Sequence, residues 1–421
     1  MTHLSFEREV DLTLVQQNLR QIVDALGFSY ELEINCPERF VAHGILKDLH
    51  GDYLSEGSGK GEAYEIGAIA EAIEHFCLEE EDSKRLNQLR GLQSHKGPPE
   101  WKASRADAPV EKPLVLSNSI KMSSYEIAGQ KFLSKDGIFK SLTRFPEVSL
   151  DCLPFVKRST NEAIFIPASF CSPFFSPEKW TPADIFLRKY STNSGVAFGS
   201  SLNEALLHGL NEVLERHFLS QFFLFLALDE PFDFHTISLQ KCPQALEIVR
   251  GRGLPELQAD LVYKATPGGL HFCAAIQRGV DRPLALIGSG VSASQEHAFK
   301  RALYELIQQN ELYNDEICAE DIMTGEFLDL SPQLHRLKDC TVEISHPNSF
   351  TVSKDEAWRP LEDLVNISLG ELDRDQPLLY RVLREFGSQG VVAQVYIPGL
   401  ERFNLIRCNG AMVAPQKVLR Q

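Results

Sequence analysis

Two segments far apart in the chain repeat one pattern, a pair of glutamates three residues apart inside an apolar stretch. The first pair is Glu71 and Glu74, and the second is Glu212 and Glu215. Residues three apart lie side by side on an α-helix, so each pair holds two like charges together at a cost of about 0.2–0.5 kcal/mol even in water. The apolar neighbours predict buried helices, where that cost is larger. Clustered carboxylate oxygens of this kind suit Mg²⁺, which also takes phosphate oxygens as ligands.

A single pair could equally be solvated on an amphipathic helix, because unpaired acidic residues are rarely buried. The repetition favours a metal site. On the second helix, one polar stripe about 80° wide holds Glu204, His208 and both members of the pair. Glu204 has a second interpretation, because Ser201-Leu202-Asn203-Glu204 matches a capping box in which Glu204 reaches back to the Ser201 amide. The residues alone leave capping and metal binding equally open for Glu204.

The composition indicates a globular chain with a sizeable core. The 421 residues are 43% hydrophobic, enough for one large domain or two ordinary ones, and no linker divides them. We find no apolar run of membrane-spanning length and no signal pattern at the N-terminus, so we expect a cytoplasmic protein with no membrane partner. The nine cysteines are scattered singly, which predicts reduced thiols. A net charge of −16 argues against a nucleic-acid partner. The basic stretch 84–112 is an exception, interpreted as a solvated loop or a dock for an acidic peptide.

Helical and strand patterns alternate along the chain, which predicts an α/β or α+β fold. Helices are expected at 11–26, around the first glutamate pair, at about 202–228 and at about 295–313. Strands are expected at 28–34, 163–167, 261–264, 270–277, 283–288 and 391–397. Residues 414–421 have no pattern and are expected to form a disordered tail that tolerates truncation.

Three further segments could contact a nucleotide. The run from Ser55 to Gly61 is not a Walker loop, but a glycine-rich turn with a lysine before a helix can approach a phosphate closely. Small and hydroxylic residues fill 191–201 and could wrap a nucleotide. Arg301 and Glu305 are four apart among apolar residues, and a half-buried guanidinium is well suited to phosphate.

These residues together resemble the YcaO-domain family. The resemblance rests on Ser58-Gly59-Lys60-Gly61, the two glutamate pairs, the 191–199 run, Arg301-Ala302-Leu303-Tyr304-Glu305 and Val395-Tyr396-Ile397-Pro398-Gly399, in order over roughly residues 55–400. It implies an α/β (α+β) fold with one large YcaO-type domain, mixed sheets and internally repeated glutamate-bearing helices. Residues 1–54 are then an integral N-terminal helix and strand, 55–400 the ATP-binding catalytic domain, and 401–421 a C-terminal strand and tail.

The resemblance also implies site residues, with ATP and Mg²⁺ as cofactors. Mg²⁺ would be held by Glu71, Glu74, Glu204, Glu212 and Glu215. ATP would be bound by Lys60, Ala197, Ser200, Glu204, Glu212, Arg216, Arg301 and Glu305, with Arg216, Arg301 and Glu305 as the catalytic residues. Many family members have asparagine where this chain has Ser200.

The activity implied by the resemblance is ATP-dependent activation of a peptide backbone amide. We expect cyclodehydration of Cys, Ser or Thr to a thiazoline or oxazoline in a ribosomally synthesised peptide, with thioamide or amidine formation, or a non-catalytic nucleotide-binding scaffold, as alternatives. Azoline-forming members commonly end in a proline-rich tail, whereas this chain ends Pro415-Gln416-Lys417-Val418-Leu419-Arg420-Gln421. The expected partners are a precursor peptide and a leader-binding E1-like or other protein, since no separate domain fits before Ser58. A dehydrogenase partner and a homodimer are further candidates.

Overall fold

The structure is a computed structural model that describes residues 7–89, 120–279, 282–346, 348–354, 359–372, 376–407 and 412–421. The first part of the chain forms α1 (Leu12–Leu26), β1 (Ser29–Glu33), η1 (Pro37–Arg39), β2 (Val41–Lys47), β3 (Tyr53–Lys60), η2 (Gly61–Ala63) and α2 (Tyr64–Leu89). The second part forms β4 (Ile120–Ser123), α3 (Ser124–Gly129), η3 (Leu133–Lys135), α4 (Gly137–Lys140), η4 (Ser141–Arg144), β5 (Ser149–Lys157), β6 (Ala163–Pro167), α5 (Ala168–Cys171), α6 (Pro182–Arg188), β7 (Val196–Gly199) and α7 (Leu202–Leu228).

The remaining elements follow α7. They are β8 (His235–Ser238), η5 (Leu239–Lys241), α8 (Pro243–Gly251), β9 (Asp260–Ala265), β10 (His271–Gln277), β11 (Leu286–Ser292), α9 (Gln295–Leu312), α10 (Asp315–Leu328), α11 (Pro332–Asp339), α12 (Leu361–Leu369), β12 (Leu379–Glu385), η6 (Gly387–Gln389), β13 (Val391–Tyr396), η7 (Phe403–Arg407) and α13 (Gln416–Leu419).

The strands form three sheets, with the orders β1-β2-β3, β11-β10-β9-β8 and β4-β5-β12-β13-β7, and β6 pairs with β5. The expected combination of helices and sheets is confirmed. The pairings between the named strands are antiparallel, so α+β is the class that applies, and the sheets are not mixed in strand direction. The reason is that neighbouring strands are joined mainly by hairpins and short connections, which give antiparallel pairs.

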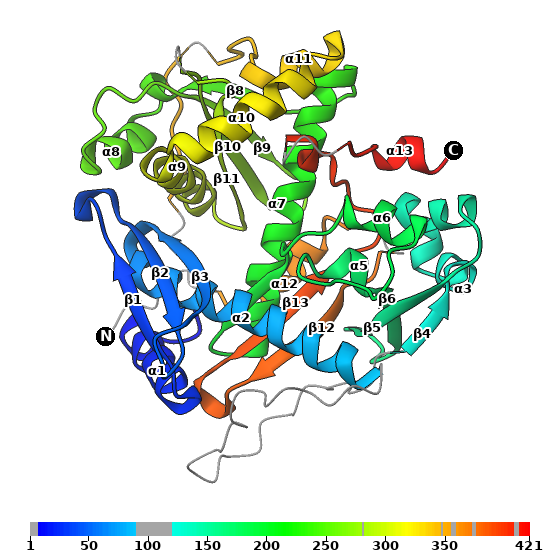
Figure 1. The fold of residues 1–421 in the computed structure, drawn as a ribbon. Coiled ribbons are helices and arrows are strands. Elements are labelled where there is room, and N and C mark those ends of the chain that lie inside the picture. Colours follow the sequence, from blue (N-terminus) through cyan, green and yellow to red (C-terminus); the bar gives the residue numbers. More distant parts are fainter. Residues whose placement is uncertain are drawn as a thin grey trace.

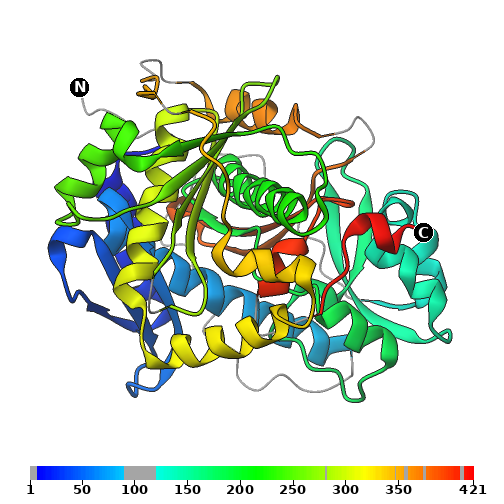
Figure 2. The same ribbon diagram turned by 90° about the horizontal axis from the view of Figure 1, so that it is seen from above.

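Helix α7 runs through the middle of the molecule and contacts strands of the second and third of these sheets (Figure 1). Ser201 caps its N-terminus by accepting a hydrogen bond from the Glu204 amide, and Asp229 ends it in the left-handed conformation. Most of its residues are buried, because leucine and phenylalanine occur around the whole circumference. Seen from above, the β8–β11 sheet and β12–β13 lie around this helix (Figure 2). Polar groups on α7 are therefore held in the interior.

Helix α2 packs directly on the β2–β3 hairpin, and this contact explains the glycines of the 55–61 segment. That segment is strand β3, not the predicted turn. A Cβ atom at Gly59 would lie 1.6 Å from the Tyr64 carbonyl oxygen, and one at Gly57 would lie 2.4 Å from the Ala72 amide nitrogen. The glycines are therefore needed for the close approach of helix to strand, and Lys60 stands at the end of a strand.

The other predicted elements are largely confirmed. The helix at 11–26 is α1, which ends at Gly27 in the left-handed conformation, and the second glutamate helix and the helix at 295–313 are α7 and α9. The strands predicted at 28–34, 163–167 and 391–397 are β1, β6 and β13. Most of the basic stretch 84–112 lies outside the described residues. None of the helices in the described part of the chain combines the length and hydropathy of a membrane span.

The expectation of a disordered tail is wrong. Residues 416–419 form α13, which contacts α4. The buried Gln416 side chain accepts a hydrogen bond from the Gly137 amide (2.6 Å) and donates to Asp136 Oδ1 (3.0 Å). Sequence periodicity missed this docking because it depends on one buried amide group and a single turn of helix.

The α2–β3 contact yields a stability prediction. Gly59→Ala should lower the free energy of unfolding by more than about 3 kcal/mol, since its methyl group meets backbone that cannot move aside without separating α2 from β3. Urea unfolding followed by circular dichroism measures the change. Gly251→Ala is the matched control, because a Cβ there meets nothing within 4 Å. Equal stability of the two variants would contradict the packing described here.

Candidate nucleotide site

The two glutamate pairs converge where α2 crosses α7. Glu71 accepts a hydrogen bond from the Ser58 amide at 2.6 Å, and Glu74 accepts one from the Phe198 amide at 2.6 Å. These bonds tie α2 to β3 and β7. Glu212, on α7, accepts one from the Gly195 amide at 3.1 Å. The carboxylates are therefore held at fixed positions by backbone donors.

The turn before β7 can take this shape only with glycine at 195. Gly195 has φ of 89°, and a Cβ atom there would lie 2.4 Å from the Val395 carbonyl oxygen on β13. The Val395 amide in turn donates to the Gly195 carbonyl oxygen at 2.8 Å. The turn is thus fixed against β13 with its amide directed at Glu212.

Burial and mutual repulsion disfavour ionisation of these carboxylates. Burial is the main cause that raises the pKa of Glu74 well above its usual range, and Glu71 and Glu212 add to it against the Phe198 hydrogen bond. Burial also raises the pKa of Glu212, with contributions from Glu215 and Glu71, while Arg216 lowers it. A cation bound here would therefore favour the ionised form of these carboxylates.

These carboxylates do not form a closed metal cage. In the described residues, no group of three or more acidic, histidine or cysteine side chains is arranged to hold a metal ion by itself. Mg²⁺ binds in proteins through one or two carboxylates and takes its other ligands from water and phosphate. The donor set fits Mg²⁺ that arrives together with a nucleotide.

Three cations lie opposite, around Glu215 and Glu305. Arg301 Nη2 is 3.5 Å from Glu215, Arg216 Nη2 is 3.8 Å from Glu305, and Lys60 Nζ is 3.3 Å from Glu305. Although burial opposes it, these neighbours, Lys60 foremost, lower the pKa of Glu305. Arg301 Nε is buried and has no hydrogen-bond partner among the described residues. Cations with spare donors beside an acidic cluster can bind phosphate.

Strand β11 orients the two acidic residues between these cations. The Ser289 hydroxyl donates to Glu215 Oε1 at 2.7 Å, and the Ser289 amide donates to Glu305 Oε2 at 3.1 Å. Glu215 comes from α7 and Glu305 from α9, so one β11 residue sets the distance between both helices at the site.

The β7–α7 connection supplies small groups at the other end of the site. Ala197 is buried on β7. The hydroxyl oxygens of Ser200 and Ser191 are buried and lack a hydrogen-bond partner within the described ranges. Since buried hydroxyl groups are normally paired, these two fit a polar ligand such as a nucleotide.

Glu204 is fully buried near the start of α7. It accepts hydrogen bonds from Arg8 Nη1 at 2.7 Å and from the Glu9 amide at 3.2 Å. Its side chain does not close a capping box, because only the Ser201 half of that motif forms. The capping box is therefore not formed, and metal binding by Glu204 stays a prediction.

Sequence analysis missed Glu7, which lies in the same site. Its carboxylate accepts hydrogen bonds from Ser292 Oγ at 2.7 Å and Asn211 Nδ2 at 3.2 Å, and it lies 3.5 Å from His297 Nε2 and 4.0 Å from Arg301 Nη1. Burial acts to raise its pKa, but His297 and Arg301 outweigh it and lower the pKa to about 2. No periodic pattern marks residues 7–9, so the sequence carried no signal for this contact.

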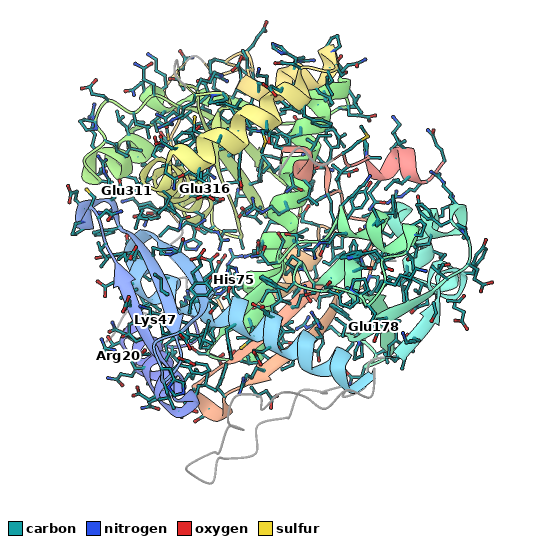
Figure 3. All side chains as sticks on the ribbon, in the orientation of Figure 1. Arg20, Lys47, His75, Glu178, Glu311 and Glu316 are labelled. Atoms are coloured by element: carbon teal, nitrogen blue, oxygen red, sulfur yellow. The ribbon has the colours of Figure 1, made fainter. Side chains whose placement is uncertain are left out.

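His75 was also missed as a site residue, although it directly follows Glu74. It lies on α2 near the middle of the molecule (Figure 3). Its Nδ1 is 2.7 Å from the Glu56 carbonyl oxygen, so Nδ1 carries the proton, and Nε2 accepts from Asn193 Nδ2 at 2.8 Å. His75 thereby links β3 to the hydroxylic turn. Its position directly after Glu74 was the available signal in the sequence.

The chain is similar to known proteins in sequence pattern and in fold. A family model described as YcaO cyclodehydratase, ATP- and Mg²⁺-binding, matches residues 57–401. No curated protein sequence matches the chain. Among solved structures, YcaO from Methanopyrus kandleri bound with AMPPCP and Mg²⁺ is 16% identical, with a TM-score of 0.56 and 98% of each chain covered.

Two further structures share the fold. A heterocyclase in complex with substrate and cofactor is 14% identical, with a TM-score of 0.62, and the alignment covers 95% of this chain but 55% of that one. The chain thus spans about half of that heterocyclase. The Escherichia coli microcin synthetase McbBCD complex is 15% identical, with a TM-score of 0.51 and coverage of 87% and 86%.

The matched family is one that binds ATP and Mg²⁺, so the predicted cofactors are confirmed. The family model covers more than three quarters of the sequence, including both glutamate pairs and the Arg301–Glu305 pair. The chain belongs to the YcaO family.

Proposed function

We propose that this protein is an ATP- and Mg²⁺-dependent enzyme that activates a backbone amide oxygen of a peptide, and that it closes azolines from Cys, Ser or Thr. The observation that carries the proposal is the arrangement of charge. Glu74 on α2 and Glu212 on α7, whose pKa values are raised by burial and by neighbouring carboxylates, face three cations from β3, α7 and α9.

ATP supplies a γ-phosphoryl group to the amide oxygen, so that the oxygen can leave as phosphate. The protein's part is to position groups and neutralise charge, as is usual for phosphoryl transfer. Glu71, Glu74, Glu212 and Glu215 would hold Mg²⁺. Arg216, Arg301 and Lys60 would bind phosphate oxygens, and Ser200 with Ala197 would line the nucleoside.

Glu305 would position the cationic side chains of Lys60 and Arg216. Its two oxygens face Lys60 and Arg216, and its position is fixed by the Ser289 amide. Glu305 therefore would keep these two cations at the phosphate without competing for Mg²⁺. Glu204, which accepts a hydrogen bond from Arg8, would also contact Mg²⁺ or the nucleotide.

The same site could serve other nucleophiles. Delivery of sulfide or an amine to the activated carbon would give a thioamide or an amidine. We favour azolines because the fold is shared with a structure described as a heterocyclase with substrate and with a microcin synthetase complex. By analogy with that complex, a precursor peptide, an E1-like or dehydrogenase partner and a homodimer remain proposals, as does a cytoplasmic location.

A non-catalytic scaffold is the alternative from another class. A scaffold would have little use for buried like charges, since such charges destabilise the fold unless a cation joins them. The intact carboxylates therefore favour an enzyme.

Mass spectrometry tests the proposal. The protein, its candidate partners, a peptide with Cys, Ser or Thr and MgATP are incubated, and each azoline formed should lower the peptide mass by one water. A gain of sulfur for oxygen with a sulfide donor would select thioamide formation. Unchanged peptide mass without phosphate release would rule out the enzyme.

Glu74→Gln tests the role of the acidic cluster. The amide can still accept from Phe198, so the fold should be kept, but loss of the charge should lower Mg²⁺-dependent phosphate release about 100-fold or more. A phosphate-release assay measures this. Glu79→Gln, exposed on the same helix, is the control and should keep the wild-type rate. Normal turnover by Glu74→Gln would make this carboxylate structural.

A further inference from the structure

A small cavity lies beside Arg216. Its walls are the hydroxylic turn with Thr192 and Ser194, Arg216 on α7, and the segment after β13 with Leu400 and Glu401. Arg216 also faces Glu305 in the nucleotide site. One guanidinium is thus shared by the nucleotide site and this cavity.

Glu401 is the carboxylate of this cavity. It is buried, with 7% of its surface exposed. One oxygen accepts from the Arg402 amide at 3.0 Å and the other from the Gln416 amide at 2.9 Å. Each oxygen thus accepts one hydrogen bond, and a carboxylate oxygen can accept two. Glu401 therefore keeps capacity for one more proton donor on each oxygen.

Helix α7 fixes the backbone of Glu401. The Glu401 amide donates to His217 Nδ1 at 3.0 Å, so this neutral imidazole carries its proton on Nε2. His217 directly follows Arg216 in the sequence. Nearby, the Asn404 amide donates to Ser220 Oγ at 2.8 Å. These hydrogen bonds fix the position of Glu401 relative to Arg216.

The docked tail completes this environment. The Gln416 amide donates to Glu401, and the Gln416 side chain donates hydrogen bonds to Asp136 Oδ1 at 3.0 Å and to the Leu400 carbonyl oxygen at 3.3 Å. Glu401 lines a second, more open cavity with His217, Gln221 and Gln416. Glu401 therefore stands between an entrance formed partly by the tail and the arginine of the nucleotide site.

The surroundings of Glu401 raise its pKa and so favour a carboxylate that can take up a proton. Burial is the main cause that raises its pKa, the amides of Gln416 and Arg402 oppose this, Asp136 adds to it, and Arg420 lowers it. The other titratable or charged groups facing it are His217 on α7, Tyr190 and Arg402. Carboxylates with raised pKa values are suited to act as general bases.

We propose that Glu401 is the general base for the nucleophile that adds to the amide. This inference rests on the proposed function. Glu401 takes the proton of the thiol, hydroxyl or other nucleophile as the bond from the nucleophile to the carbonyl carbon forms. The π electrons of the C=O bond move to the oxygen, which is the atom that receives the γ-phosphoryl group. His217 and Gln416 are positioning residues.

The pH dependence of Glu401→Gln tests the assignment. In the wild type, modification should slow below the raised pKa, because protonated Glu401 cannot accept a proton. Glu401→Gln should lower the modification rate about 100-fold and lose this acid limb. Its affinity for a Mg²⁺-bound non-hydrolysable ATP analogue, measured by calorimetry, should stay within about 3-fold. Glu230→Gln, a surface glutamate paired with Lys417, should behave as the wild type.

The outcomes separate two failures. A wild type that neither releases phosphate nor modifies peptide overturns the proposed function and this inference together. An active wild type with a Glu401→Gln rate within about 3-fold and an unchanged acid limb overturns the inference alone. If Glu401→Gln does not fold, Glu401→Asp decides, because its shorter carboxylate should keep the acid limb but slow the reaction about 10-fold. A wild-type rate for Glu401→Asp would overturn the assignment.

Discussion

The crowding of carboxylates on α2 and α7, where Glu71, Glu74 and Glu212 are half-buried, is the constraint on which the site depends. Burial raises the pKa of Glu74 and of Glu212, and neighbouring carboxylates add to it: Glu71 and Glu212 at Glu74, and Glu215 and Glu71 at Glu212. A fold that carries this cost is stabilised by whatever cation binds there. The rest of the architecture brings these helices together: glycines at 57 and 59 let α2 lie directly on β3, and Gly195 directs its amide at Glu212.

The site has two ends, and the three cations opposite the acidic cluster form one of them. Lys60, Arg216 and Arg301 come from three different elements, and Glu215 and Glu305 hold them in place. The buried, unpaired hydroxyl of Ser200 lies at the start of α7, where Glu204 and Arg8 also meet. A ligand with a polar nucleoside and charged phosphates satisfies both ends at once, and the family assignment identifies it as ATP with Mg²⁺.

Much of this could be predicted from the sequence, because helical periodicity exposes polar residues on an apolar helix. The glutamate pairs, α1, α7, α9 and the Arg301–Glu305 pair were found in this way. Contacts without periodicity were not: Glu7 reaches Arg301 from an unpatterned segment, and the tail is docked by backbone and side-chain hydrogen bonds, among them those of Gln416. The glycines of β3 were read as a turn, since glycine permits both a turn and a close helix contact, and only the packing distinguishes them.

The central claim is that the buried carboxylates bind nucleotide phosphates only through Mg²⁺. Thermal unfolding with a non-hydrolysable ATP analogue, in Mg²⁺ or in a chelator, tests it most directly, since a ligand stabilises a protein according to its concentration relative to Kd. We predict that Tm rises by several degrees with analogue and Mg²⁺ together, and by about one degree or less with either alone. An equal rise in the chelator would contradict the account, because the nucleotide would then bind without neutralising Glu71, Glu74, Glu212 and Glu215.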